Sequence, residues 1–148
     1  MSKTYFISGH RNITEVEFIK HYEPILWQRI CDEEDIKFVV GDCSGVDDMA
    51  QKYLKALGFK DEVNVYHMLE SPRHNAGFKL VGGFNSDVER DFTMTKNSDA
   101  DIAWVRKGSE RSGTQQNIDR RNWMNERITK GLPISLEELN KREANNFI

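Results

Sequence analysis

The chain has 148 residues and a formal net charge of −3; 38% of its residues are hydrophobic and 30% are charged. This length and balance fit one globular domain with a sizeable core. The mild acidity argues against bulk affinity for nucleic acid, and without an apolar run of about 18 residues no membrane-spanning helix is expected.

The cellular setting follows from the N-terminus and the cysteines. The chain passes from Met1 straight into a predicted strand, so we expect no signal peptide. Cys31 and Cys43 have neither metal-binding nor redox spacing, which favours a reduced, cytoplasmic protein. We predict no metal and no cofactor.

The first predicted strand, Lys3 to Ser8, is a compact apolar run that ends in a glycine turn. In this turn Gly9 allows close backbone approach, His10 follows it, and Ser8 and Arg11 can hold a phosphate. The alternative for Arg11 is a solvated loop residue. Thr14 then fits a capping box that opens a helix, which Pro24 should break or kink.

The second strand, Phe38 to Val40, runs into a turn with two glycines, Gly41 and Gly45, and then a helix that ends near Gly58. A strand, a glycine turn and a helix N-terminus together favour an anion site, to which Ser44 would belong. The spacing matches neither the dinucleotide-binding fingerprint nor the P-loop.

The acidic residues of this turn leave two interpretations open. Asp42 and Asp47 crowd a turn that should hold an anion, so it is either an ordinary strand–helix connection with an acidic cap or a site with two subsites. In the second case Asp47 would contact a sugar hydroxyl next to a phosphate that is bound by the backbone.

The second half continues the alternation of strands and helices. We expect strands at Val63 to His67 and Asp101 to Val105, with a long loop over residues 68–83 and a helix over residues 84–97 between them. A helix from Ser112 to Lys130 follows, and a short helix capped by Ser135 closes the chain. A weak strand pattern covers residues 133–135.

This alternation predicts an α/β fold, a Rossmann-like three-layer sandwich with a mostly parallel sheet and helices on both faces. Residues 1–148 would form one domain, with a core of about residues 3–130 and a helical tail over residues 131–148. Three glycine-bearing loops, at residues 8–11, 41–47 and 108–114, should meet at the carboxyl ends of the strands. Their convergence indicates a phosphorylated small molecule, with a nucleotide as the natural candidate.

Several short motifs give the chain a family resemblance. FISGHR at residues 6–11 resembles the opening strand and turn of the SLOG superfamily, which includes the LOG phosphoribohydrolases and YspA-type proteins. GDCSGVD at residues 41–47, ERDFTM at 89–94, SDADIA at 98–103 and SGTQQN at 112–117 resemble its later motifs. The resemblance covers about residues 3–130.

The resemblance implies a nucleotide-binding protein, and many members cleave an N-glycosidic bond. Carried over by position, Arg90 matches the family's catalytic arginine, and Gly113 and Thr114 match its phosphate turn. Asn117 stands where LOG enzymes have a catalytic glutamate, so another carboxylate, Glu89, Asp42 or Asp47, must carry the reaction, or the chain only binds.

Two functions are therefore expected. The first is hydrolysis of a nucleoside 5′-monophosphate or related nucleotide to base and sugar phosphate; the alternative is a non-catalytic nucleotide sensor or sequestering module. The catalytic candidates are Arg90, Glu89 and Asp47. The candidates for nucleotide binding are Ser8, Gly9, His10, Arg11, Gly41, Asp42, Ser44, Gly45, Arg111, Ser112, Gly113, Thr114 and Asn117.

Self-association is also expected. Large apolar side chains on polar helices, Trp27, Trp123 and Met124, together with the family resemblance, predict a homodimer or larger oligomer.

Overall fold

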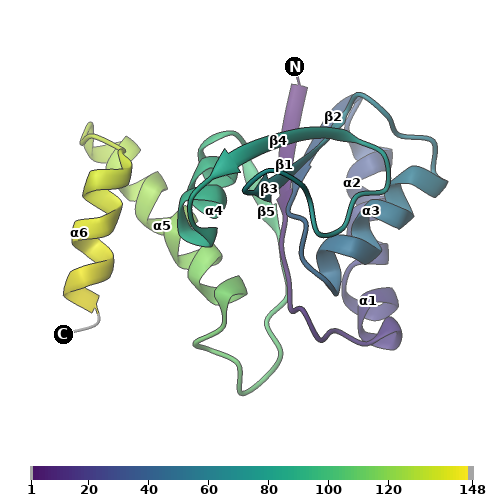
Figure 1. Ribbon diagram of the computed structural model, residues 1–148, viewed down its shortest axis with the longest axis horizontal. Coiled ribbons are helices and arrows are strands. Elements are labelled where there is room, and N and C mark those ends of the chain that lie inside the picture. Colours follow the sequence, from purple (N-terminus) through teal and green to yellow (C-terminus); the bar gives the residue numbers. More distant parts are fainter. Residues whose placement is uncertain (1, 147–148) are drawn as a thin grey trace.

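A computed structural model describes residues 2–146 of the chain, in which five strands and six helices follow one another (Figure 1). In chain order the elements are β1 (Ser2–Ile7), α1 (Glu15–His21), α2 (Glu23–Asp32), β2 (Asp35–Val40), α3 (Val46–Ala56), β3 (Val63–Met68), β4 (Lys79–Phe84), α4 (Asp87–Lys96), β5 (Ala100–Ile102), α5 (Gly113–Lys130) and α6 (Leu136–Asn146). The strands form one parallel sheet in the order β4-β3-β2-β1-β5.

The register of the central strands brings their carboxyl ends together. Ile7 at the end of β1 pairs with Val40 on one side and Ile102 on the other. Because β1, β2 and β5 end level with one another, the loops that follow them start at the same edge of the sheet. This is the edge where an open α/β sheet binds ligands.

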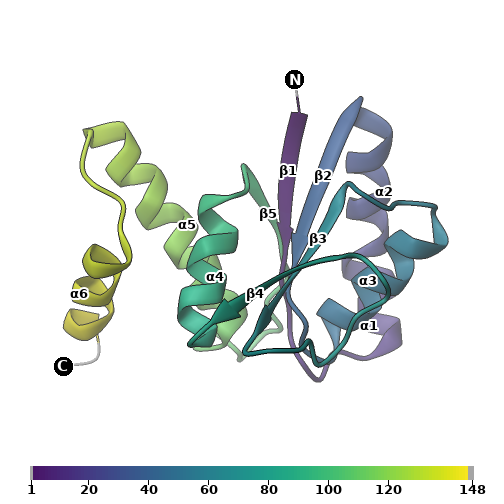
Figure 2. The same cartoon turned by 45° about the horizontal axis from the view of Figure 1, so that its top comes forward.

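Alternating side chains of the strands pack against helices on both faces of the sheet. Tyr5 and Ile7 face the larger core, which α1, α2 and α3 cover, whereas Phe6 faces the opposite side and packs with Met94 of α4. Figure 2 shows these two helix layers on either side of the strands, with α5 beside α4. The predicted α/β sandwich with helices on both faces is therefore confirmed.

The last helix forms an additional layer outside the sandwich. Figure 2 shows α6 on the outer side of α5. Leu139 of α6 is fully buried and packs with Phe92 of α4 and Met124 of α5. The side chain of Ser135 accepts a hydrogen bond from the backbone of Glu138 at 3.1 Å, as expected for its cap. The tail is thus a packed helix through Asn146.

Other local signals also match the structure. Both halves of the capping box at Thr14 are formed, and the chain divides into α1 and α2 with Pro24 in the first turn of α2. Gly131 adopts the left-handed conformation that ends α5, with φ of 68°. None of the helices in residues 2–146 is long and apolar enough to cross a bilayer.

Three details differ from the expectation. Residues 79–83, expected in a loop, and Phe84, expected at the start of a helix, form the edge strand β4, and the sheet is wholly parallel. The sequence did not predict β4 as a strand because it contains Gly82 and Gly83 and is mostly exposed, so it lacks the apolar run that marks a buried strand. Residues 133–135 form no strand; they connect α5 to α6.

The strand order places a switch point between β1 and β5. From β1 the chain moves through β2 and β3 to β4 at one edge, and then α4 carries it back to β5 on the other side of β1. The loops after β1 and β5 therefore leave the sheet in opposite directions. A crevice at such a point is the usual ligand site of this class of fold.

Candidate functional site

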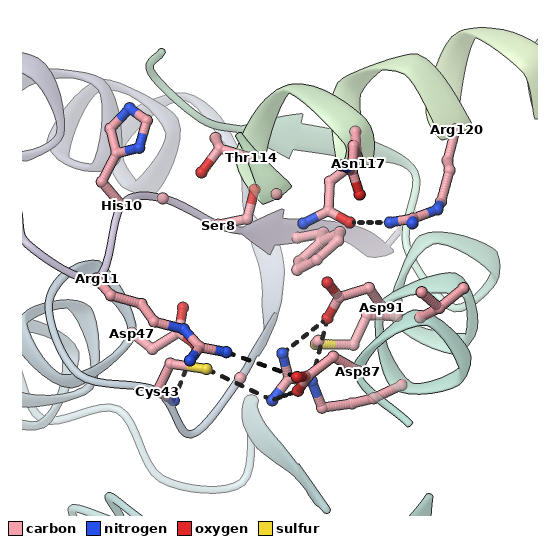
Figure 3. Close-up of a pocket in the computed structure, with 18 residues that line it drawn as sticks. Ser8, His10, Arg11, Cys43, Asp47, Asp87, Asp91, Thr114, Asn117 and Arg120 are labelled. Carbon is pink, nitrogen blue, oxygen red and sulfur yellow. Dashed lines mark hydrogen bonds and ion pairs between the residues drawn. The ribbon is translucent and has the colours of Figure 1, made fainter. Parts of the chain in front are cut away.

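A cavity of about 350 Å³ opens at this switch point (Figure 3). It lies between the loops that follow β1 and β2 and the first turns of α4 and α5. Its lining residues are Phe6, Ser8, Gly9, His10, Arg11, Gly41, Cys43, Asp47, Asp87, Val88, Arg90, Asp91, Met94, Gly113, Thr114, Gln116, Asn117 and Arg120.

One wall of the cavity carries hydrogen-bond donors for an anion. Ser112 caps α5 by accepting from the backbone of Gln115 at 3.2 Å, which leaves the N–H groups of Gly113 and Thr114 without an acceptor among the described residues. The hydroxyl of Ser8 is buried and has no hydrogen-bond partner there either. Ser8 and Thr114 lie next to each other in Figure 3. Free N–H groups at a helix N-terminus with a neighbouring hydroxyl suit a phosphate.

The turn after β1 is held in place by one tyrosine. The hydroxyl of Tyr22 donates to the carbonyl of Ser8 at 2.7 Å and accepts from the backbone of Trp104 at 3.0 Å, so it joins the ends of β1 and β5. Gly9 is required here, because a Cβ atom would lie 2.3 Å from a methyl group of Val46. The turn can therefore pack directly on α3.

His10 and Arg11 extend this wall to the mouth of the cavity. Nε2 of His10 accepts from the backbone of Arg106 at 2.9 Å, so the neutral ring carries its proton on Nδ1. Burial and the charge of Arg106 lower the pKa of His10. Arg11 is exposed and forms an ion pair with Asp87 at 3.6 Å, which spans the mouth between the β1 loop and α4 (Figure 3).

The opposite wall contains Asp47 in the first turn of α3. One oxygen of its carboxyl group accepts from the backbone of Cys43 at 3.1 Å. Gly41 makes room for this oxygen, because a Cβ atom at that position would lie 2.5 Å from it. Burial raises the pKa of Asp47 to about 7, although the charge of Arg90 opposes the shift. Asp47 can therefore gain or lose a proton near neutral pH.

Arg90 lines the cavity and is surrounded by carboxylates. Its guanidinium donates to Asp42 at 2.9 Å and to Asp91 at 3.1 Å, and it also contacts Asp87 and the sulfur of Cys43. Burial would raise the pKa of Asp42, but the bonds from Arg73 and the charge of Arg90 hold it below its usual value. Arg90 thus has several carboxylate partners before any ligand arrives.

The far end of the cavity is built by α4 and α5. Arg120, almost fully buried, donates to the side-chain oxygen of Asn117 at 2.8 Å and to Glu143 of α6 at 3.0 Å. Asp91 faces them from α4 (Figure 3). Burial raises the pKa of Asp91, while Arg90, Arg120 and Asn117 oppose the shift.

The structure brings most of the expected site residues to this one cavity. Those that line it are Ser8, Gly9, His10, Arg11, Gly41, Asp47, Arg90, Gly113, Thr114 and Asn117. The others lie outside the lining. Asp42 is beneath it, Gly45 packs against the backbone of His10, and Ser44 bonds to the carbonyl of Arg11 at 3.4 Å. Glu89 accepts from the backbone of Asn85 at 3.2 Å.

Arg111 and Ser112 also lie outside the lining, in the loop that leads into α5, where Ser112 serves as the helix cap. Sequence reasoning missed Cys43, Asp87, Asp91, Gln116 and Arg120 as lining residues. Helical spacing offered a signal for two of them, since Asp87 precedes Arg90 by three residues and Arg120 follows Asn117 by three residues.

No group of three or more histidine, cysteine, aspartate or glutamate side chains within residues 2–146 is arranged to hold a metal ion. Comparison with protein-family models, curated proteins and solved structures gives no significant match in any of the three. The SLOG resemblance is therefore carried by the short motifs alone and stays a prediction.

Proposed function

We propose that the cavity binds a nucleoside 5′-monophosphate or a related nucleotide and that the protein hydrolyses its N-glycosidic bond. One observation carries the proposal: the free donors at the start of α5 and the buried carboxyl of Asp47 line the same cavity. The donors suit a phosphate, and the carboxyl suits a sugar that develops positive charge.

The phosphate would lie against Ser8, Gly9 and Thr114. The hydroxyl of Ser8 is buried without a partner, and a phosphate oxygen would give it one. Arg11 at the mouth adds a positive charge, which would turn from Asp87 toward the phosphate.

Asp47 would carry the reaction at the sugar. Cleavage of a glycosidic C–N bond builds positive charge on the sugar ring, which a nearby carboxylate stabilises. In the proposed step a water oxygen bonds to C1′ while Asp47 takes the proton of that water. The electrons of the broken bond leave with the base nitrogen, which takes up a proton from solvent, and Asp47 then releases its proton to solvent, so that one water is consumed for each base released. A pKa of about 7 suits this exchange at neutral pH.

Arg90 has a different role from the one that its resemblance to the family's catalytic arginine suggests. Because Asp42 and Asp91 already occupy its guanidinium, it would orient the carboxylates and set their charge rather than hold the phosphate. Glu89 lies outside the cavity lining, so it is no longer a favoured catalytic carboxylate.

Base release tests this proposal. Purified protein would be incubated with a panel of nucleoside monophosphates, and free base would be measured by chromatography. Asp47→Asn should bind nucleotide but lose about a hundredfold or more in turnover, the scale of one acid–base group. Asp48→Asn, one residue along α3, and Glu89→Gln serve as controls that should keep full activity.

Two outcomes would contradict the proposal. Full activity of Asp47→Asn would remove Asp47 from the reaction. Equal thermal stabilisation by nucleosides and their monophosphates would remove the phosphate site, since bound ligand at about a hundredfold excess over Kd should add about 2–3 kcal/mol of stability.

A second candidate function is a nucleotide-binding module without catalysis. It is favoured by Asn117, a neutral amide where LOG enzymes carry a catalytic glutamate. This function predicts tight nucleotide binding with no base release from any member of the panel.

A further inference from the structure

The amide of Asn117 has a fixed orientation. Its oxygen accepts a hydrogen bond from Arg120 at 2.8 Å, so its NH₂ group must point the other way. Figure 3 shows the amide nitrogen on the side of the cavity, toward Ser8. Asn117 therefore presents donors, and not an acceptor, to a ligand.

Arg120 offers a second donor at the same end of the cavity. Its Nε and Nη1 are bonded to Glu143 and Asn117, and Nη2 has no acceptor among the described residues. The side chain lines the cavity and is otherwise almost fully buried. Because Arg120 cannot lose its charge, this donor is permanent.

Asp91 offers an acceptor beside them. Arg90 approaches Oδ1 of Asp91 at 3.0 and 3.1 Å, and the Asn117 side chain and the charge of Arg120 also oppose the rise in the pKa of this carboxyl group. Because a carboxylate has about four acceptor positions, Asp91 can still accept a further hydrogen bond from a ligand. In Figure 3 the carboxylate of Asp91 points toward Asn117. The far end of the cavity thus presents one acceptor and two donors, next to the apolar side chains of Phe6 and Met94.

We propose that Asp91, Asn117 and Arg120 recognise the base of the ligand and that this base is a 6-oxopurine, guanine or hypoxanthine. This inference rests on the proposed function, because it takes the phosphate to lie at the start of α5. The N1–H of a 6-oxopurine would donate to Asp91, O6 would accept from Asn117, and N7 would accept from Arg120.

Adenine fits the same groups poorly. Its N1 is an acceptor and would face the Asp91 carboxylate, and its 6-amino group is a donor and would face the donors of Asn117. Two buried polar groups would lose their partners, and such mismatches reject a ligand much more strongly than a change of size does. Uracil supplies only the first two partners and should bind with intermediate affinity.

Calorimetric titration of the wild-type protein with four nucleotides tests the assignment. The ligands are inosine, guanosine, adenosine and purine riboside 5′-monophosphates, the last of which lacks a substituent at position 6. The two 6-oxopurine nucleotides should bind about tenfold or more tightly than the other two. If base is released during the titration, the ratio of kcat/KM values is compared instead.

A protein variant tests the role of Asn117 separately. Asn117→Asp keeps the bond from Arg120 and places an acceptor in the cavity, so the preference for inosine over adenosine monophosphate should fall about tenfold or reverse. Asn122→Asp, on the exposed face of α5, is the matched control and should keep the preference. Circular dichroism and thermal unfolding would verify that both variants are folded.

The outcomes separate this inference from the proposed function. Equal or tighter binding of adenosine monophosphate to wild type would overturn the base assignment and leave the nucleotide site standing. An unchanged preference in folded Asn117→Asp would overturn the assignment to Asn117. Failure of all four purine nucleotides to bind would overturn this inference, and the base-release panel of nucleoside monophosphates would then decide the proposed function separately.

Discussion

The ionisation of Asp47 should be measurable in the stability of the fold. An aspartate in the unfolded chain has a pKa of about 4, whereas burial raises the pKa of Asp47 to about 7. Between these values the folded state binds the extra proton, so the contribution of Asp47 to stability is greatest below about pH 4 and falls as the pH rises to about 7.

The first prediction follows from this shift. Asp47→Asn removes the titrating group, so as the pH rises from 5 to 8 the variant should gain stability relative to wild type. The gain should be a few kcal/mol at most, since one pKa unit corresponds to about 1.4 kcal/mol. Urea unfolding at several pH values measures it, with Asp48→Asn as the control that should show no such trend. A parallel pair of curves for wild type and Asp47→Asn would rule out the raised pKa.

Gly41 supports the same carboxyl group through its lack of a side chain. In Gly41→Ala the new Cβ atom would lie 2.5 Å from Asp47, so we expect a loss of about 1–3 kcal/mol in stability. Gly113→Ala is the matched control, because a Cβ atom there meets no atom within 4 Å, and it should change stability by about 0.5 kcal/mol or less. Chemical unfolding of the two variants decides the prediction, and equal effects would contradict it.

At the level of residues, the turns were easier to predict than the helix faces. Gly9, Gly41 and Thr114 lie at strand ends or at a helix start, and such positions can be assigned from the sequence because glycine and capping residues mark them. Asp91 and Arg120 lie within helices. Which helix face meets the cavity depends on how α4 and α5 pack on the sheet, and local sequence contains little of that information.

Among the elements, β4 and α6 show what apolar periodicity misses and what it captures. β4 is an edge strand with both faces largely exposed, so no alternation of apolar residues marks it. The segment 136–146 has a capping serine and a buried Leu139, and its helix was expected. Its contact with the site, through Glu143 and Arg120, involves two polar residues 23 positions apart and could not be inferred from spacing.

The ion pair between α5 and α6 gives the third prediction. Arg120 is almost fully buried, so Glu143→Gln would remove the carboxylate that is bonded directly to its guanidinium and should cost about 1–3 kcal/mol of stability. Glu137→Gln, on the same helix, removes only an exposed pair with Lys141 and should cost about 0.5 kcal/mol or less. Thermal unfolding compares the two variants, and an equal, small effect would show that α6 contributes no charge compensation to the site.

For the whole molecule, the convergence of the loops was predictable and the chemistry between them was only partly so. Alternating strands and helices imply a parallel sheet, and parallel strands bring their carboxyl ends to one edge. The charge balance of the cavity is a property of the assembled fold. Arg90 meets Asp42, which lies 48 residues away in the sequence, so the carboxylate partner of this arginine could not be read from local spacing.

The last prediction concerns self-association. Met124 is buried inside the chain and Trp123 packs partly in the same cluster, so of the three residues that suggested an oligomer only Trp27 remains largely exposed. Trp27 lies on α2, and α1 beside it exposes Val16 and Ile19, so the helix layer over one face of the sheet carries unburied apolar side chains.

We expect light scattering to give at least twice the chain mass of 17.2 kDa for the wild-type protein. Trp27→Glu should return the protein to one chain mass, because a charge cannot be buried unpaired. Ile128→Glu, a similar change at an exposed apolar residue of α5, should leave the mass unchanged. A wild-type mass of 17.2 kDa at all concentrations would refute the expectation, and an oligomer that Trp27→Glu does not disrupt would place its interface on another face.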